Sequence, residues 1–130
     1  MSDELKYSLD KLGNAIQRLE EGVKKSKDQL DRDGVIQRFE LTFELLWKTL
    51  RLFLLEEGII TKSPKDSLKE GFKFGLIKNE ETFLDMLEDR NQTSHIYSEE
   101  VSIEIFNRIK TDYLKPLKTI LNEIKRSTEN

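Results

Sequence analysis

The residues with the greatest potential for chemistry lie close together, in the run RNQTSHIY at positions 90–97. This run contains Arg90, the only histidine of the chain (His95) and Tyr97. An arginine binds a phosphate through a planar fork of N–H donors, and a histidine transfers protons near neutral pH. The pair therefore suits phosphodiester or nucleotide chemistry. A structural role fits the same spacing. Arg90 would then cap a helix end, His95 would form hydrogen bonds between helices, and Tyr97 would pack as an aromatic side chain.

The composition predicts one domain spanning residues 1–130. A chain of 130 residues is long enough to bury a core without disulfides or metals. It contains no cysteine, which excludes disulfides, a thiol nucleophile and a thiolate metal site, and is compatible with a reducing compartment. The N-terminal stretch lacks the apolar core of a signal peptide, and no apolar run approaches the length of a membrane span. We therefore expect a cytoplasmic protein without membrane contact.

The charge balance predicts that any contact with nucleic acid is local. The 22 Lys and Arg residues are outnumbered by 25 Asp and Glu residues, which gives a formal net charge of -3. A chain-wide basic surface of the kind that drives non-specific nucleic-acid binding is therefore not expected. The high share of charged residues, 36% of the chain, favours helices whose outer faces are solvated.

Apolar residues recur at alternating steps of three and four in the first half of the chain, which predicts two long helices. The first is expected over residues 3–25 and the second over about 32–57, with Gly58 ending the second in a left-handed conformation. The second helix has a wide apolar surface, so we expect it at the centre of the fold or in an oligomer interface. The two stripes consist of Leu5, Leu9, Leu12, Ile16, Leu19 and Val23, and of Ile36, Phe39, Phe43, Leu46, Leu50 and Phe53.

Shorter helices are expected in the second half, where polar residues suited to capping a helix start precede apolar stripes. Pro116 should kink the last helix, because it lacks the N–H that would bond to Asp112. The predicted fold is all-α, an antiparallel four-helix up-and-down bundle whose third helix is either one broken helix or two. The expected helices and their caps are 64–76 after Ser63, 80–94 after Asn79 and 99–126 after Ser98.

Two further patterns have ordinary structural explanations. Glu40, Glu44 and Lys48 lie four residues apart. Carboxylates at this spacing can ligate a metal, but the lysine that follows them favours an intrahelical ion-pair ladder. The GFKFG run at 71–75 matches no glycine-rich nucleotide fingerprint, and its glycines indicate close helix packing or fraying. Trp47 and the phenylalanines are interpreted as core or dimer-surface residues in preference to base-stacking platforms.

Three stretches of the sequence resemble one known family. Similarity to the nucleotidyltransferase substrate-binding protein family extends over GVIQRFELTFELLWKTLRLFL (34–54), SPKDSLKEGFKFGLI (63–77) and DRNQTSHIYSEE (89–100). That family belongs to the HEPN superfamily of small helical bundles. It is similar to the HepT toxins, which pair with a minimal nucleotidyltransferase antitoxin, MntA. The resemblance implies a HEPN-like bundle and a separate MntA-like nucleotidyltransferase as partner.

The resemblance also implies a ribonuclease site. In the superfamily, an arginine and a histidine separated by four to six residues form a metal-independent ribonuclease centre, usually assembled across a homodimer. By this resemblance His95 acts as general acid or base on a ribose 2′-hydroxyl or the leaving oxygen. Arg90 then binds the scissile phosphate, and Asn91 helps to orient it. Neither a metal nor another cofactor is implied.

Tyr97 completes the longer family pattern, which ends in His-x-Tyr. In the HepT branch this tyrosine accepts adenylate groups from the nucleotidyltransferase, which blocks the site. The resemblance therefore implies Tyr97 as the modified residue. The family also supports an alternative, in which the helical protein is the non-catalytic substrate- or nucleotide-binding subunit of a two-component nucleotidyltransferase.

Overall fold

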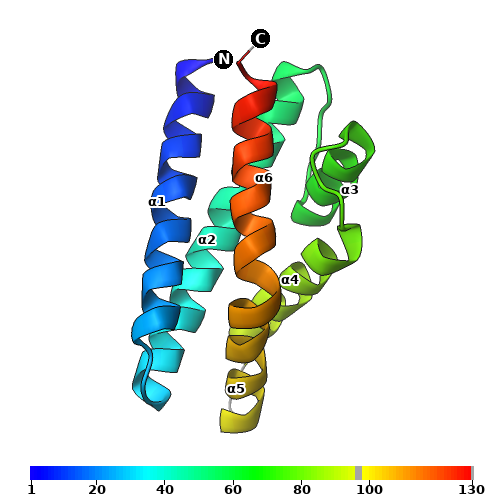
Figure 1. The fold of residues 1–130 in the computed structure, drawn as a ribbon. Coiled ribbons are helices and arrows are strands. Elements are labelled where there is room, and N and C mark those ends of the chain that lie inside the picture. The colour runs from blue at the N-terminus through cyan, green and yellow to red at the C-terminus, as the bar shows by residue number, and fades with distance from the viewer. Residues whose placement is uncertain (96–97, 130) are drawn as a thin grey trace.

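The helices form an antiparallel bundle with both chain termini at the same end (Figure 1). The computed structural model describes residues 1–95 and 98–129, and the described residues contain helices and no strands. The predicted all-α bundle is therefore confirmed. Its elements are α1 (Asp3–Lys25), α2 (Gln29–Glu56), α3 (Pro64–Phe74), α4 (Glu80–Thr93), α5 (Glu99–Arg108), a π-helical segment (Ile109–Tyr113) and α6 (Leu114–Ser127).

The two long helices begin where a side chain caps the first turn. Ser2 accepts a hydrogen bond from the backbone N–H of Leu5, and α1 has the predicted bounds. Helix α2 begins three residues earlier than expected, because Asp28 caps it by accepting from the N–H of Asp31. Residues 28–34, whose three aspartates also suit a turn, therefore contain the N-cap and the first turns of α2. Gly58 follows α2 with a φ of 84°, which confirms its predicted role.

The third helix of the predicted bundle is broken into α3 and α4. Gly75 ends α3 in a left-handed conformation with a φ of 96°, and Asn79 caps α4 through the N–H of Thr82. Gly71 has a different role, since a Cβ atom there would lie 3.0 Å from the side chain of Leu50. The two glycines of the GFKFG run thus serve helix termination and close packing against α2.

The last helix of the predicted bundle consists of α5, the π-helical segment and α6, and it contains one irregular turn. The backbone N–H of Leu114 donates to the carbonyl of Ile109, five residues earlier, within the π-helical segment. This segment ends at Tyr113, three residues before Pro116. The structure thus has a widened turn just ahead of the proline, and the kink at Pro116 itself stays a prediction.

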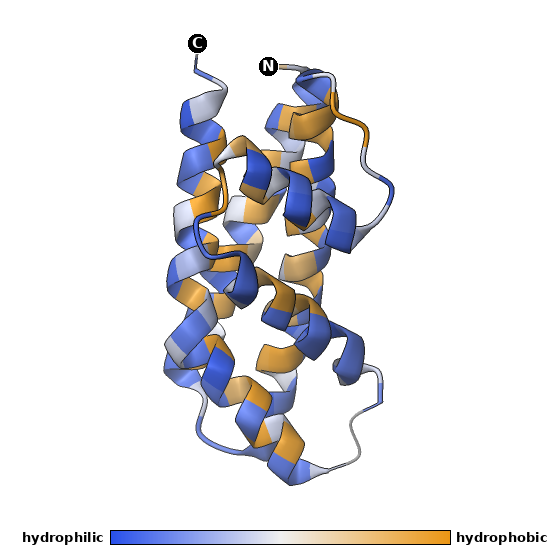
Figure 2. Ribbon diagram, turned by 90° about the vertical axis from the view of Figure 1, so that its right-hand side faces the viewer, coloured by the Kyte–Doolittle hydropathy of each residue, from blue (hydrophilic) through white to orange (hydrophobic). Residues whose placement is uncertain are grey.

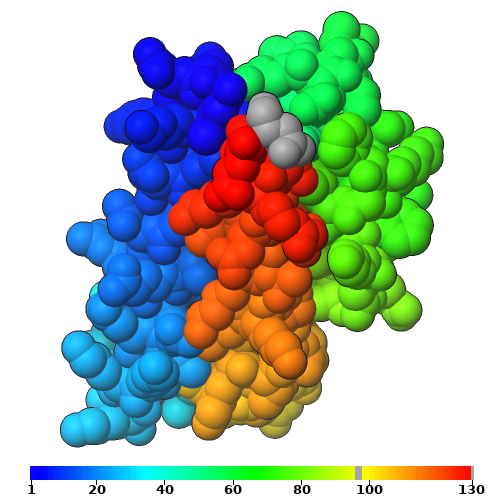
Figure 3. Space-filling view, turned by 45° about the horizontal axis from the view of Figure 1, so that its top comes forward, coloured from blue at the N-terminus to red at the C-terminus, as the bar shows by residue number. Residues whose placement is uncertain are grey.

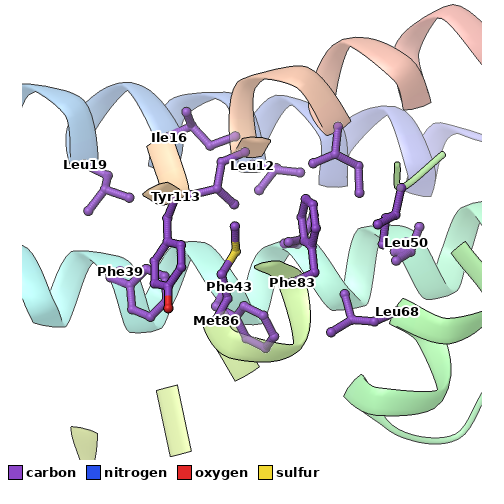
Figure 4. Close-up of a cluster of buried hydrophobic side chains, with 14 of the residues drawn as sticks. Leu12, Ile16, Leu19, Phe39, Phe43, Leu50, Leu68, Phe83, Met86 and Tyr113 are labelled. Carbon is purple, nitrogen blue, oxygen red and sulfur yellow. The ribbon is translucent and has the colours of Figure 1, made fainter. Parts of the chain in front are cut away.

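The core lies where α1, α2, α4 and α6 meet, and buried hydrophobic side chains from these helices gather there (Figure 4). Figure 2 shows apolar and hydrophilic residues interspersed along every helix. All six residues of the predicted α2 stripe are buried, as are five of the six in α1, with Val23 partly buried. Helix α2 contacts α1, α3, α4 and α5, which confirms its predicted central position. Within residues 1–95 and 98–129, no helix combines the length and apolar composition needed to cross a membrane.

Candidate functional site

The end of α4 positions the residues singled out in the sequence. Arg90 lies in its last turn and is partly buried, whereas Asn91 and His95 are exposed. The helix stops at Thr93, and the backbone N–H of His95 donates to the carbonyl of Gln92 at 2.9 Å. Arginine, asparagine and histidine thus lie in the last turn of α4 and in the turn that follows it. Tyr97, like Ile96, lies outside the described residues.

Arg90 is held by a carboxylate from the neighbouring helix. Its Nη2 group donates to Oε1 of Glu44 on α2, and its Nη1 group approaches Oδ1 of Asn91 at 3.4 Å. The indole N–H of Trp47 donates to the other oxygen of Glu44 at 3.0 Å, and Lys48 lies 3.8 Å from that oxygen. The predicted ladder is therefore realised only between Glu44 and Lys48. The stronger contact of Glu44 is the one with Arg90, which links α2 to α4.

This arrangement orients Arg90 and uses only some of its N–H donors. A guanidinium carries five N–H donors in a fixed plane, and the two contacts to Glu44 and Asn91 account for two of them. Among the described residues the remaining donors have no hydrogen-bond partner, and such donors in one plane match the geometry of a phosphate. In the part of the chain that the structure describes, no hydrogen bond joins Arg90 to His95.

Replacing Glu44 with alanine tests this contact. Both Glu44 and Arg90 are partly exposed, so the free energy of unfolding should fall by about 1 kcal/mol or less. Trp47, the only tryptophan, should show red-shifted fluorescence, because its indole N–H would then donate to water in place of Glu44. Glu40→Ala, one turn away on α2, is the matched control and should leave the emission unchanged. Equal emission shifts in both variants would contradict the assigned contact.

A buried ionic cluster fixes the helix turn that carries Arg90. The preceding residue, Asp89, is 5% exposed and accepts two hydrogen bonds from Arg108, each of 2.8 Å, and a third from the hydroxyl of Tyr113. Tyr113 in turn stacks on Phe39, with ring centroids 5.5 Å apart. Asp89 therefore anchors the end of α4 to α5 and to the π-helical segment.

The electrostatics of this cluster favour a neutral phenol at Tyr113 and a charged guanidinium at Arg108. Burial raises the pKa of the Tyr113 phenol, and its hydrogen bond to Asp89 raises it further. The hydrogen bonds to Asp89 likewise raise the pKa of the Arg108 guanidinium. The cluster was not predicted from the sequence. The signal in the sequence is the position of Asp89, which lies three residues after Met86, as Met86 lies three after Phe83, on the buried face of α4.

A polar cleft of about 430 Å³ lies beside the loop that joins α4 to α5. Thr93 and Ser98, which flank the loop, contribute to its wall, together with residues of the first half of α2. Three carboxylates line it, from Asp33, Glu40 and Glu99. Such a lining suits hydrogen-bond donors and cations better than phosphates.

Comparison with known proteins extends the resemblance found in the sequence. The model of a family described as "nucleotidyltransferase substrate binding protein like" matches residues 7–126. The Haemophilus influenzae protein named "Probable ribonuclease HepT" is 30% identical over 101 residues, which are 74% of this chain and 68% of that relative.

Solved structures share the fold over most of the chain. A crystal structure from Thermus thermophilus has a TM-score of 0.83 and 34% identity, and covers 88% of this chain and 99% of its own. A Haemophilus influenzae structure, described as revealing the fold of a substrate binding domain of a nucleotidyltransferase, has a TM-score of 0.78 and 27% identity. It covers 90% of this chain and 98% of its own.

Proposed function

Because the chain belongs to the nucleotidyltransferase substrate binding protein-like family, we propose that it is the HEPN-like partner of a minimal, MntA-like nucleotidyltransferase and acts as a metal-independent endoribonuclease. In this proposal residues 1–130 form one domain that works as a homodimer. Adenylylation at Tyr97 silences the enzyme, so the pair operates as a toxin and its antitoxin.

The observation that carries the proposal is the presentation of Arg90 and His95 at the end of α4. Arg90 is oriented by Glu44 and Asn91 and retains donors for a phosphate, while His95 is exposed on the adjoining turn. An oriented guanidinium stabilises the charge that develops on a phosphoryl group in the transition state. An exposed imidazole can take up or release a proton near neutral pH.

The chemistry follows from these two groups. His95 removes the proton from a ribose 2′-hydroxyl, and the oxygen attacks the adjacent phosphorus while Arg90 binds the non-bridging oxygens. The bond to the 5′-oxygen breaks, and this oxygen receives a proton, which leaves a 2′,3′-cyclic phosphate and a 5′-hydroxyl. Each chain has only one histidine. A second copy would supply the second imidazole, so that one acts as base and the other as acid.

Silencing at Tyr97 has a direct electrostatic reason in this scheme. Tyr97 is two residues from His95 in the sequence. An adenylate joined to its phenol adds a phosphodiester with negative charge, and Arg90 offers the planar donors that bind such a group. The modified side chain would then occupy the place of the scissile phosphate.

A second candidate function is the non-catalytic substrate- or nucleotide-binding subunit of a two-component nucleotidyltransferase. The carboxylate-lined cleft beside the loop favours it, because the charge there opposes an RNA backbone. Hydrogen-bond donors of a nucleobase, or basic residues of the partner enzyme, fit such a lining better.

Intact-mass spectrometry after co-expression with a minimal nucleotidyltransferase separates the two functions. A mass gain in adenylate steps that disappears in Tyr97→Phe is the result expected for the silenced enzyme. RNA incubated in EDTA with the protein expressed alone should then yield cyclic-phosphate ends. A stable complex without mass gain, together with intact RNA, would instead support the binding subunit.

A further inference from the structure

A basic segment surrounds α3 and was not used in the proposed site. Residues 59–79 contain five lysines and two acidic residues, a local net charge of +3 in a chain whose net charge is -3. The rest of the chain therefore carries -6. In Figure 3 this segment, in green, forms one side of the molecular surface. The five lysines are Lys62, Lys65, Lys69, Lys73 and Lys78.

Helix α3 turns three of these lysines and one aromatic residue outward together. Its buried residues are Ser67, Leu68 and Gly71. At 100° per residue the opposite half of the helix carries the outward set, which we call the α3 face. Phe72 in this set is 43% exposed, so it is not one of the phenylalanines of the core. The α3 face consists of Lys65, Lys69, Phe72 and Lys73.

The acidic residues of α3 leave much of this charge uncompensated. The carboxylate of Asp66 accepts a hydrogen bond of 3.2 Å from the backbone N–H of Lys62, at the start of the helix. Glu70 lies 3.4 Å from the ammonium of Lys73. In the part of the chain that the structure describes, neither Lys65 nor Lys69 forms an ion pair.

We propose that the α3 face binds single-stranded RNA, with Lys65 and Lys69 contacting phosphates and Phe72 stacking on a base. Cations beside an exposed aromatic ring are the combination that binds single strands without sequence preference. A membrane surface fits less well, because a helix lying on lipid needs an exposed apolar face, whereas α3 buries its own against α2. The identity of the ligand rests on the proposed ribonuclease function.

The position of the α3 face gives it a role in that function. Residues 75–79 connect α3 to α4, whose 14 residues span about 21 Å and whose last turn contains Arg90. A single strand anchored on the α3 face can therefore extend along α4 toward Arg90 and His95. The basic segment thus supplies the local RNA contact that the acidic chain as a whole lacks.

Fluorescence anisotropy with a labelled 2′-O-methyl oligouridylate tests the proposal, because this RNA has no free 2′-hydroxyl and cannot be cleaved. Lys65→Gln combined with Lys69→Gln should weaken binding by about fivefold or more and reduce the salt slope by about 1.4, for two lost phosphate contacts. Phe72→Ala should weaken binding by about fivefold with the salt slope unchanged. The matched control, Lys24→Gln with Lys25→Gln at the end of α1, should bind like the wild type.

Three results would overturn the proposal. The first is unchanged affinity in the α3-face variants, or an equal loss in the control. The second is binding to phosphatidylserine vesicles but not to the oligonucleotide. The third is a shift from dimer to monomer in Phe72→Ala, measured by light scattering, with RNA affinity unchanged. Failure of the ribonuclease function is distinguishable, since normal α3-dependent binding without cleavage of natural RNA would refute only the catalytic proposal.

Discussion

Replacing His95 with alanine should lower the rate of RNA cleavage by at least about 100-fold while the protein stays folded. General acid–base catalysis by a positioned side chain contributes roughly 10²–10⁴-fold, and His95 is the only imidazole in the chain. Because its side chain is exposed, the free energy of unfolding should change by no more than about 0.5 kcal/mol. Initial rates on a labelled RNA in EDTA and a thermal melt of the same preparation measure both effects.

Two matched variants make the result specific. Gln92→Ala alters an exposed neighbour on the same turn and should cleave like the wild type. Arg90→Lys keeps the positive charge but loses the planar fork, so cleavage should fall even though a cation remains. A mixed dimer of His95→Ala and Arg90→Ala subunits adds a test of shared sites. If His95→Ala retained full activity, the assigned proton transfer would be wrong.

The bundle was predictable because its helices repeat simple local signals. The apolar stripes of α1 and α2 specify which faces are buried, and the caps at Ser63, Asn79 and Ser98 all accept the expected backbone hydrogen bonds. Where the bounds differ, a competing local signal explains it. Asp28 begins α2 inside a stretch whose several aspartates also suit a turn.

The contacts between helices were less predictable, because they depend on packing angles that no single stripe encodes. The spacing of Glu44 and Lys48 predicted their ion pair correctly, but the contact of Glu44 with Arg90 joins residues 46 positions apart. The contact between Asp89 and Tyr113 was likewise not predictable, since helical periodicity indicates that both positions are buried but not that they contact each other. Sequence thus located the candidate residues at the end of α4, but not the groups that orient them.

Replacing Asp89 with alanine should destabilise the protein by about 3 kcal/mol, more than any other single change considered for this end of α4. The substitution removes three hydrogen bonds and leaves the buried hydroxyl of Tyr113 without its acceptor. Breaking one partner of a buried ion pair costs roughly 3–5 kcal/mol, and the low end applies because Arg108 is partly exposed. Urea unfolding monitored by circular dichroism measures the loss. Asp85→Ala, an exposed aspartate one turn earlier, should have little effect.

The pH dependence of the cluster provides an independent test through Tyr113→Phe, which removes only the hydroxyl. Because the pKa of Tyr113 is raised in the folded state, its contribution of about 1.5 kcal/mol should be fully present below its ordinary pKa of 10.0. That contribution should fall as the pH rises above this value, since the unfolded phenol ionises first. The difference in unfolding free energy between wild type and Tyr113→Phe should therefore be constant from neutral pH to about pH 9 and then shrink. A difference that changed between pH 6 and 8 would point to another titrating group and contradict the assignment to the phenol.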